Sequence, residues 1–433
     1  MYSIWEEGIE LPFFDELEGD QSTEVLIIGG GLAGILCAYF LQESGVDYML
    51  LEGDRICGKT TKNTTAKITF QHGLLYHKLL RKKGLEQTQM YLGANQAAVN
   101  KYFELCRNID CDFEVKPSYV YSIDKAEKLE KEMRALEAVG YTPELSKTLE
   151  LPFPTAGAVK FHEQAQFHPL KFAGSIAKNL NIYENSFVRE LGDHWAVTDK
   201  GKVAYKKLII ATHFPIDNKH GLYFMKMYQH RSYVIALKNA SNVRGMYVDE
   251  AKGGLSFRNQ KDYLLIGGGG HRTGKRGGSW QELRSFGAKY YSGCTEDFSW
   301  AAQDCIPIDD VPYIGRYSKH MGDCFVATGF QKWGVSTSMA AAMILRDLVM
   351  EKQNEYAQLF SPSRNMLKPR LFMNLWESAS NLLSFSKKRC PHLGCALKWN
   401  GAEHSWDCPC HGSRFDAQGH VLDNPANGNA QWK

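Results

Sequence analysis

The distribution of apolar residues predicts that the chain opens with a β-α-β unit. Residues 23–29 form a short, mainly apolar run that ends in glycine, as expected for a buried strand. Residues 32–43 have the composition and length of a helix, and residues 48–52 (YMLLE) form a second buried strand. Together the three elements take about 30 residues, the usual length of a β-α-β unit.

The rest of the sequence alternates between helical and strand-like patterns. Leu, Lys and Glu recur at helical spacing between residues 73 and 150, most clearly over 84–103 and 124–139. Further strands are expected at 207–212, 233–237 and 263–267, and a further helix at 335–350. Residues 353–389 form a polar connector with helical character and no clear run of period two. Strands and helices in this order predict an α/β architecture.

Composition and charge narrow the class of protein. Of the 433 residues 44% are hydrophobic, which suits a globular protein of two or three domains. The 51 basic and 48 acidic side chains leave a net charge of +3, which gives no reason to expect a nucleic-acid partner. Residues 1–25 hold eight acidic and no basic side chains, so they lack the basic start of an export signal, and we expect a cytoplasmic protein.

One uncharged segment, residues 25–42, is just long enough to suggest a membrane span. Three consecutive glycines near its start argue against one long helix, and its flanks are acidic rather than basic. A strand, a glycine turn and a helix explain the same residues, so we expect no membrane span.

The turn between the first strand and the first helix carries the pattern G-x-G-x-x-G. Gly29 permits the tight turn, Gly31 lets a pyrophosphate approach the backbone, and Gly34 lets the helix pack on the strand. The helix N-terminus then offers N–H groups to the phosphates. Glu52, at the end of the second strand, can accept hydrogen bonds from ribose hydroxyls. The sequence therefore predicts a dinucleotide site, although spacing alone does not separate FAD from NAD.

Five segments resemble the D-amino-acid oxidase/glycine oxidase superfamily of FAD-dependent enzymes. They are VLIIGGGLAG (25–34), LLEGDRICGKTT (50–61), KLIIATHFP (207–215), DDVPYIG (309–315) and FVATGFQKWGVS (325–336). The resemblance implies FAD as the cofactor and a discontinuous Rossmann-like FAD-binding domain with an inserted α+β substrate domain. It also implies that Thr60 and Thr61 lie near the flavin diphosphate or ring and that Val188 touches the adenine side. The isoalloxazine would be lined by Gly329, Trp333, Gly334 and Val335.

The substrate side departs from this superfamily. Many of its amino-acid oxidases hold the substrate carboxylate with an arginine shortly before the D-x-x-P-x-x-G segment. Residues 300–315 (WAAQDCIPIDDVPYIG) contain Gln303 and no arginine, so bidentate recognition is missing there. The candidates for substrate contact are Arg258, His271, Arg272 and Gln303, although exposed loop positions explain the first three equally well. The substrate need not be an amino acid.

The C-terminal tail carries a second chemistry. Cys390-x-His392 and Cys408-x-x-His411 are separated by residues 393–407. Two thiolates on one iron and two imidazoles on the other are the ligands of a Rieske [2Fe-2S] cluster, with potentials of about −150 to +300 mV. The tail resembles the Rieske family, in which residues matching Cys395 and Cys410 form a disulfide in high-potential members. Ser413 matches a hydroxyl that bonds a bridging sulfide, whereas Phe415 replaces a tyrosine donor, so a lower potential is expected.

A structural zinc site is the alternative interpretation, because Cys2His2 also suits tetrahedral zinc. The spacing C-x-H is awkward for zinc, and the extra cysteines need no zinc explanation. Rieske domains usually place several strands before the first ligand loop, and residues 353–389 show none. We therefore expect a small and incomplete Rieske domain, joined directly to the flavoprotein.

The expected fold class is α/β plus β. An FAD-dependent oxidoreductase is expected over residues 1–352, a connector over 353–385 and the Rieske-type domain over 386–433. The FAD parts would be about 23–72, 150–215 and 305–352, and the substrate parts about 73–149 and 216–304.

Three functions remain open from the sequence. In the first, FAD oxidises an amine-like or other small molecule and the cluster passes electrons to an acceptor protein or small carrier. In the second, the protein is an oxidase that uses O2, and the cluster domain is vestigial. In the third, it is an electron-transfer or redox-sensing protein with no dedicated small substrate.

Overall fold

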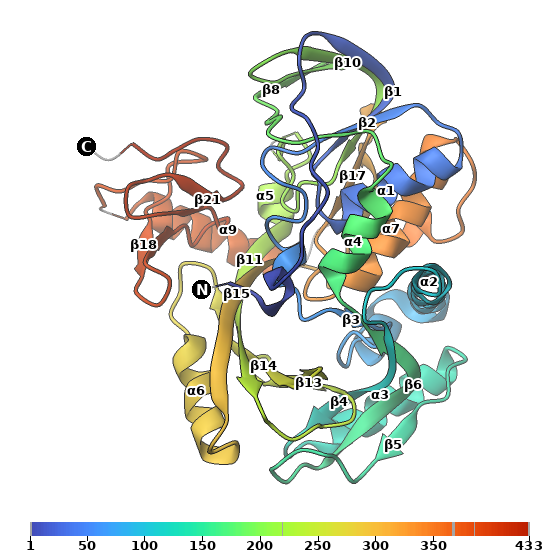
Figure 1. The fold of residues 1–433 in the computed structure, drawn as a ribbon, viewed down its shortest axis with the longest axis vertical. Coiled ribbons are helices and arrows are strands. Elements are labelled where there is room, and N and C mark those ends of the chain that lie inside the picture. The colour runs from blue at the N-terminus through green and yellow to red at the C-terminus, as the bar shows by residue number, and fades with distance from the viewer. Residues whose placement is uncertain (1, 219, 366–368, 385, 432–433) are drawn as a thin grey trace.

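The computed structural model describes residues 2–218, 220–365, 369–384 and 386–431. Its described strands form two large sheets, which lie one above the other in Figure 1, and a small third sheet beside them. The small sheet belongs to the C-terminal part of the chain.

The first large sheet is built around the N-terminal β-α-β unit. Strand β1 (Gln21–Ile28) runs parallel to β2 (Tyr48–Leu51) on one side and to β10 (Lys202–Ile210) on the other. The strand order is β16-β17-β10-β1-β2-β7, and β8 and β9 form a hairpin attached to β10. The other bounds are β7 (Ile182–Tyr183), β8 (Glu190–Gly192), β9 (Trp195–Val197), β16 (Tyr313–Ser318) and β17 (Met321–Thr328).

Two helices that are far apart in sequence pack together against this sheet. They are α1 (Leu32–Glu43) and α7 (Gly334–Val349), which lie side by side in Figure 1 and share one apolar core. Both present small and apolar side chains to that core, such as Ile35 and Met339. Among the described helices, none combines the length and the apolar composition that a membrane crossing requires.

The second large sheet supplies the other half of the molecule. Its strands follow the order β15-β11-β14-β13-β12-β4-β6-β3, and β5 pairs with β6. Their bounds are β3 (Lys67–Ile68), β4 (Glu114–Ser122), β5 (Glu144–Ser146), β6 (Gly157–Gln166), β11 (Met227–Lys238), β12 (Met246–Asp249), β13 (Ser256–Gln260), β14 (Tyr263–Arg272) and β15 (Thr295–Pro307). Strand β11 is antiparallel to both β14 and β15 and is buried along most of its length.

The remaining helices connect or cover the sheets. Their bounds are η1 (Ile4–Glu6), η2 (Thr61–Asn63), α2 (Tyr76–Cys106), α3 (Ala126–Ala138), α4 (Pro169–Ala177), α5 (Tyr223–Lys226), α6 (Ser279–Tyr290), α8 (Ala357–Phe360) and α9 (Pro369–Leu382).

Most predicted elements lie where the hydrophobic pattern placed them, but β4 and β5 are strands within the stretch 73–150 that was expected to be helical. Two further differences are instructive. The helix expected from residue 84 is preceded by a further helical segment that begins at Tyr76, and the non-helical Gly84 (φ 83°) forms a kink between the two segments of α2. Strand β14 extends to Arg272, so His271 and Arg272 are strand residues and not part of a loop. The division into FAD and substrate parts stays a prediction; β3 and β6, from stretches assigned to the FAD parts, pair within the second sheet.

The C-terminal sheet is small. Four antiparallel strands of two or three residues follow one another in chain order: β18 (Lys398–Asn400), β19 (Ser405–Asp407), β20 (Arg414–Phe415) and β21 (Val421–Asp423). In the described part of 353–389, helices α8 and α9 stand where strands would usually precede the first ligand loop. The core of this region is correspondingly small and includes four cysteines.

A buried ion network joins the C-terminal sheet to the second large sheet. Arg231 of β11 donates to Glu403 in the turn between β18 and β19, with 3.0 Å between Arg231 Nε and Glu403 Oε1. Arg414 bonds the same carboxylate and also contacts Asp407 and Asp423 at 3.0 and 2.9 Å. Tyr233 Oη donates to Glu403 at 3.0 Å. Glu403 is therefore the carboxylate that both parts of the chain share.

We expect Glu403→Gln to lower the free energy of unfolding by about 3–5 kcal/mol, because two buried arginines lose a shared anion. Burial alone would raise the pKa of Glu403, but the charges of Arg231 and Arg414 outweigh burial and hold that pKa below its usual value. The stabilisation is therefore present above a pH of about 4.3 and is lost as the pH falls further. Chemical unfolding at several pH values measures both effects.

The matched control is Glu130→Gln, which removes the exposed pair with Arg134 and should cost less than about 0.5 kcal/mol. Equal losses in the two variants would contradict the role given to Glu403.

Candidate flavin and iron–sulfur sites

The glycine turn has the geometry that a pyrophosphate cradle requires. Gly29 has a positive φ of 111°, and a Cβ there would stand 2.7 Å from the Ala211 carbonyl oxygen. A Cβ on Gly34 would stand 1.9 Å from the Gly29 carbonyl oxygen, so α1 packs on β1 only with glycine at that position. A Cβ on Gly31 would have only Thr61 Oγ1, at 3.5 Å, within 4 Å, so the space in front of the helix N-terminus is open.

The carboxylate of Glu52 lies beside this turn. It accepts hydrogen bonds from the backbone N–H groups of Gly30 (2.6 Å) and Asp54 (3.0 Å). Burial raises the pKa of Glu52, and these two N–H groups partly oppose the rise. The structure thus places Glu52 next to the cradle, where its expected ribose contact would be made, and also gives it a structural role in holding the turn.

The other residues expected on the diphosphate and adenine sides lie nearby. Thr61 Oγ1 accepts a hydrogen bond from the N–H of Leu32 at 3.0 Å, so it caps the first turn of α1. Thr60 immediately precedes the short helix η2. Val188 is buried in the core beside β2, two residues after Ser186, whose N–H bonds the Glu52 carbonyl oxygen. Three separate chain segments therefore meet at the glycine turn.

The segment expected to line the isoalloxazine forms the loop before α7. Gly329 has a positive φ of 73°, and Gly334 has no atom within 4 Å of a built Cβ. The ring of Trp333 stacks on His72 with 4.9 Å between centroids. Val335 is buried, and its carbonyl oxygen accepts a bond from Tyr102. The loop is thus fixed by packing on one side and open at Gly334.

Several buried polar atoms near these segments lack a hydrogen-bond partner among the described residues. They are Gln71 Oε1, His213 Nε2, His230 Nδ1, Ser232 Oγ and Gln331 Nε2. Buried polar groups are normally satisfied, so these exceptions need an explanation. His213 lies in the KLIIATHFP segment and Gln331 in the loop before α7, which are the segments assigned to the flavin. The donor and acceptor atoms therefore fit a polar cofactor such as FAD.

Three titratable side chains on the same side of the sheet were not singled out from the sequence as a group. His230 of β11 lies directly opposite Asp304 of β15, and Lys332 follows in the loop before α7. Burial raises the pKa of Asp304 to about 7, against the charges of Lys332 and Arg231. Burial, together with the charge of the exposed Lys332, lowers the pKa of His230 to about 3. No periodicity predicts this group, because it joins three separate segments.

Arg258 is fully buried in β13, so it is not the exposed loop residue that the sequence allowed as an alternative. It bonds the Gln260 amide oxygen (2.6 Å) and the Ala66 carbonyl oxygen (3.3 Å), and its guanidinium lies over the Trp5 ring. Burial lowers its pKa to about 9, and burial with the Arg258 charge lowers the pKa of Lys67 to about 7. Two buried cations with neutral oxygen partners are suited to receive an anion.

The other substrate candidates face the C-terminal domain. Gln303 Nε2 donates to the Gly412 carbonyl oxygen at 2.9 Å, and Gln303 Oε1 accepts from Thr273. His271 bonds Tyr233, and Arg272 donates to the Cys410 carbonyl oxygen at 3.3 Å. The structure therefore brings Gln303 and Arg272 to a cluster-ligand loop, and His271 to Tyr233, which bonds Glu403 of the C-terminal part.

The two histidines of the tail converge. The His392 and His411 rings lie 5.1 Å apart between centroids, at an angle of 89°. His411 Nδ1 is buried and lacks a hydrogen-bond partner among the described residues, as expected for an atom that binds a metal. Burial lowers the pKa of His411 to about 3, so the ring stays neutral, which is the form that ligates iron.

The two cysteines of the same motif are also in contact. The hydrogen bond with the Cys408 thiol is the largest effect that lowers the pKa of Cys390, to about 7, while burial opposes it. The Ser413 hydroxyl and the backbone N–H groups of His392 and Leu393 stabilise the Cys390 thiolate further. The thiolate is the ligand form, so the donor set fits a [2Fe-2S] cluster.

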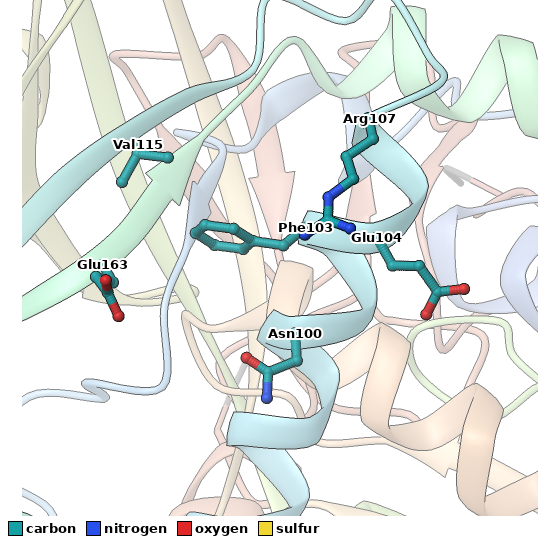
Figure 2. Close-up of a pocket in the computed structure, with 6 residues that line it drawn as sticks. All are labelled: Asn100, Phe103, Glu104, Arg107, Val115 and Glu163. Carbon is teal, nitrogen blue, oxygen red and sulfur yellow. The ribbon is translucent and has the colours of Figure 1, made fainter.

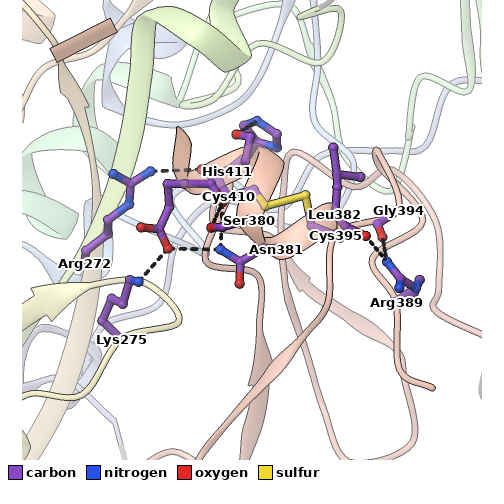
Figure 3. The surroundings of a disulfide bond; sticks show 12 residues. Arg272, Lys275, Ser380, Asn381, Leu382, Arg389, Gly394, Cys395, Cys410 and His411 are labelled. Carbon is purple, nitrogen blue, oxygen red and sulfur yellow. Dashed lines mark hydrogen bonds and ion pairs between the residues drawn. A yellow bond between two sulfur atoms is a disulfide. The ribbon is translucent and has the colours of Figure 1, made fainter. Parts of the chain in front are cut away.

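A disulfide links the two ligand loops. Cys395 and Cys410 are bonded, with 6.6 Å between their Cα atoms, in the arrangement that the Rieske resemblance implied (Figure 3). Their sulfur atoms lie within 4.8 Å of Cys408. Ser413 is buried and accepts from the Ala426 N–H, and Phe415 lies in the small core. The loops are therefore clamped covalently next to the cluster ligands.

A separate groove of about 530 Å³ lies between α2, β4 and β6 (Figure 2). Its lining residues are Asn100, Phe103, Glu104, Arg107, Val115 and Glu163. None of them belongs to the residues predicted for FAD or for the cluster.

Comparison with known proteins gives the class of the chain. Residues 24–348 match the family described as FAD dependent oxidoreductase, and residues 366–432 match the Rieske [2Fe-2S] domain. The chain therefore belongs to the FAD-dependent oxidoreductase family and carries a Rieske domain at its C-terminal end. The two matches imply FAD and a [2Fe-2S] cluster as cofactors, and they decide between the cluster and zinc interpretations in favour of the cluster.

Individual relatives agree with both parts. The "Putative Rieske 2Fe-2S iron-sulfur protein YhfW" of Bacillus subtilis is 32% identical, over 98% of this chain and 96% of that protein. A cytochrome b6-f complex iron-sulfur subunit of Trichormus variabilis is 58% identical over 38 residues, which are 9% of this chain and 21% of that protein.

Solved structures support the fold of the larger part. Glycine oxidase from Geobacillus kaustophilus aligns with a TM-score of 0.68 at 17% identity. The alignment covers 80% of this chain and 100% of the glycine oxidase chain. L-proline dehydrogenase from P. horikoshii aligns with a TM-score of 0.69 at 15% identity, over 80% of this chain and 98% of the dehydrogenase chain.

We expect Gly31→Val to abolish flavin retention, because a branched side chain would fill the open space in front of α1. The purified variant should lose its flavin absorbance, with affinity weakened by at least about 100-fold. Gly253→Val, at another glycine with open space and no positive φ, is the matched control and should keep its flavin. Full flavin content in Gly31→Val would contradict the proposed cradle.

We expect anaerobically prepared protein to contain about two irons and about two acid-labile sulfides per chain. Cys408→Ser and His392→Ala should each remove them and leave FAD in place, since the flavin segments end well before the tail. Iron and sulfide analysis with low-temperature EPR of the reduced protein measures this. Zinc in place of iron would contradict the assignment of a [2Fe-2S] cluster to these ligands.

Proposed function

We propose that the protein oxidises a small, amine-like or other small-molecule substrate at FAD and passes the electrons to its own Rieske cluster. Bound FAD supplies two-electron oxidation of the substrate, and the cluster accepts electrons one at a time. The observation that carries the proposal is that one strand, β15, contacts two loops. It bonds the cluster-ligand loop at Gly412 and the expected flavin loop at Gln331.

Neutral amide side chains hold the ligand loop. Gln303 Nε2 bonds the Gly412 carbonyl oxygen, and Gln229 Nε2 bonds the carbonyl oxygens of His411 (3.1 Å) and Asn424 (2.9 Å). A Cβ on Gly412 would stand 2.5 Å from Gln229 Cβ, so the contact is close along the backbone. The loop is thus positioned by the flavoprotein and not only by its own domain.

The same strand leads to the flavin side. The N–H of Gln331, in the loop expected to line the isoalloxazine, donates to the Cys305 carbonyl oxygen at 3.0 Å. Cys305 is two residues from Gln303 along β15, a separation of about 6.6 Å in a strand. One strand therefore contacts both redox segments, which supports electron transfer within the chain.

Both histidines of the motif face the flavoprotein. His392 Nε2 bonds Asn218 Oδ1 at 2.9 Å, just after the KLIIATHFP segment. The His411 ring packs edge-on against Phe224, with 5.5 Å between centroids. These contacts come from the larger domain, so the imidazole edge of the cluster is turned toward the side on which electrons would arrive.

For the substrate, the buried Arg258 and Lys67 offer a place for an anionic group, while the Gln303 position is occupied by the cluster loop. Lys332 in the loop before α7, with Asp304 and His230 on the adjacent strands, can hold or move a proton near the substrate. A small molecule with an anionic group and an oxidisable C–N or C–O bond fits these side chains.

The test is anaerobic stopped-flow spectroscopy of the protein loaded with both cofactors, against a panel of amines, amino acids and hydroxy acids. A substrate should bleach the flavin first and the cluster second. We expect Gln229→Leu with Gln303→Leu to slow the second phase by about tenfold, because lost hydrogen bonds of about 1 kcal/mol each loosen the docked loop. The first phase should not change.

The control is Gln418→Leu, which changes an exposed glutamine of the C-terminal domain and should leave both phases unchanged. Stoichiometric peroxide in air, with a cluster that stays oxidised, would instead favour the oxidase function. Reduction by NAD(P)H with no response to the panel would favour an electron-transfer or sensing role.

A further inference from the structure

Helix α9 has the reverse of the usual polarity for a surface helix. Its side chains that face the protein are polar, and Asn374 and Asn381 are buried. Its large apolar side chains face outward: Phe372 is 65% exposed, Met373 67% and Trp376 77%. The apolar stripe continues beyond the helix with Leu383, which is 81% exposed. Surface helices normally bury such a stripe, so this face is built to meet something apolar.

Specific polar contacts fix this orientation. Arg272 Nη1 donates to Asn374 Oδ1 at 3.0 Å, and Lys275 pairs with Glu377 at 2.5 Å (Figure 3 shows Arg272 and Lys275 beside the disulfide region). The backbone carbonyl oxygen of Asn381 accepts a hydrogen bond from the Ala396 N–H at 3.1 Å. The helix is therefore held by its polar face, and rotating it to bury the apolar face would break these contacts.

Basic residues lie just after the apolar stripe and in a recess next to α9. Residues 369–389 contain four basic side chains and one acidic side chain, Glu377, which is already paired. Lys387 and Arg389 are exposed just after the helix, and Arg389 donates to the Leu382 carbonyl oxygen at its end. Lys275, which pairs with Glu377 of α9, also lines a recess with Arg276, Lys398 and the half-exposed Trp399. The rim is therefore positively charged.

We infer that α9 lies in the surface of an anionic lipid bilayer, with Phe372, Trp376 and Leu383 at the headgroup–acyl boundary and the basic rim on the lipid phosphates. An apolar face with aromatic residues and a Lys/Arg-rich border is the pattern of helices that lie in this interface. The helix has 14 residues and is about 21 Å long, too short to span a bilayer. A second copy of the chain would bring two like-charged rims together, which disfavours self-association.

The placement does not depend on the proposed function, but it bears on the cluster. Ser378 of α9 lies 3.5 Å from His411 Nε2, measured from its Oγ atom. The same helix therefore covers a cluster ligand with its polar side and contacts the bilayer with its apolar side. The Rieske domain would be the part of the molecule closest to the membrane.

The experiment is flotation of the full-length, FAD-loaded protein with vesicles of phosphatidylcholine alone or mixed with phosphatidylglycerol. We expect binding to the anionic vesicles and little to the neutral ones. Phe372→Ser, Trp376→Ser and Leu383→Ser in one chain should weaken binding more than tenfold, because three large apolar side chains are lost. Lys387→Glu should weaken it by about fivefold, and added salt should do the same.

The matched control is the triple change Leu85→Ser, Val115→Ser and Ile123→Ser, which removes exposed apolar side chains from elsewhere on the surface. It should bind as the natural chain does, and circular dichroism and flavin content should be unchanged in all variants. Equal binding by the two triple variants, or no binding of the natural chain to anionic vesicles, would overturn the inference. A dimer that dissociates only in the α9 variant, without vesicle binding, would assign the surface to a second copy.

Discussion

The carboxylate of Glu403 is the interaction on which the arrangement of the two domains depends. It neutralises Arg231 from the large sheet and Arg414 from the small one, and all three side chains are buried. Removing water from such charges is costly, so the contact forms only when both partners are correctly placed. The C-terminal domain is therefore held in one orientation, and its ligand loops are pressed against β11 and β15.

That constraint explains how a short Rieske domain can be folded. Its own sheet has four strands of two or three residues and a small core, which would be marginal alone. The flavoprotein supplies part of the missing scaffold through Gln229 and Gln303, and α9 supplies another part through polar contacts near His411. The disulfide between Cys395 and Cys410 then ties the two ligand loops together.

The alternation of side chains along β11 and β15 separates two tasks. Gln229, Arg231 and Gln303 point to the cluster domain, whereas His230 and Asp304 lie with Lys332 on the side of the flavin loop. Successive residues of a strand face opposite sides of a sheet, so neighbouring residues of these strands face different parts of the chain. The two strands form the shared wall between the expected flavin site and the cluster.

The sequence by itself determined the elements and motifs whose cause is local. The glycine turn and α1 follow from the spacing of glycines and apolar residues, and the four cluster ligands follow from two short Cys/His patterns. The tertiary structure decided which residues gather from distant segments. Gln303 was a candidate for substrate contact from the sequence, and only the structure shows that its amide bonds the carbonyl oxygen of Gly412, more than a hundred residues away. The outward apolar face of α9 was equally hidden, because a helical pattern shows that two faces differ but only packing shows which one is turned toward the protein.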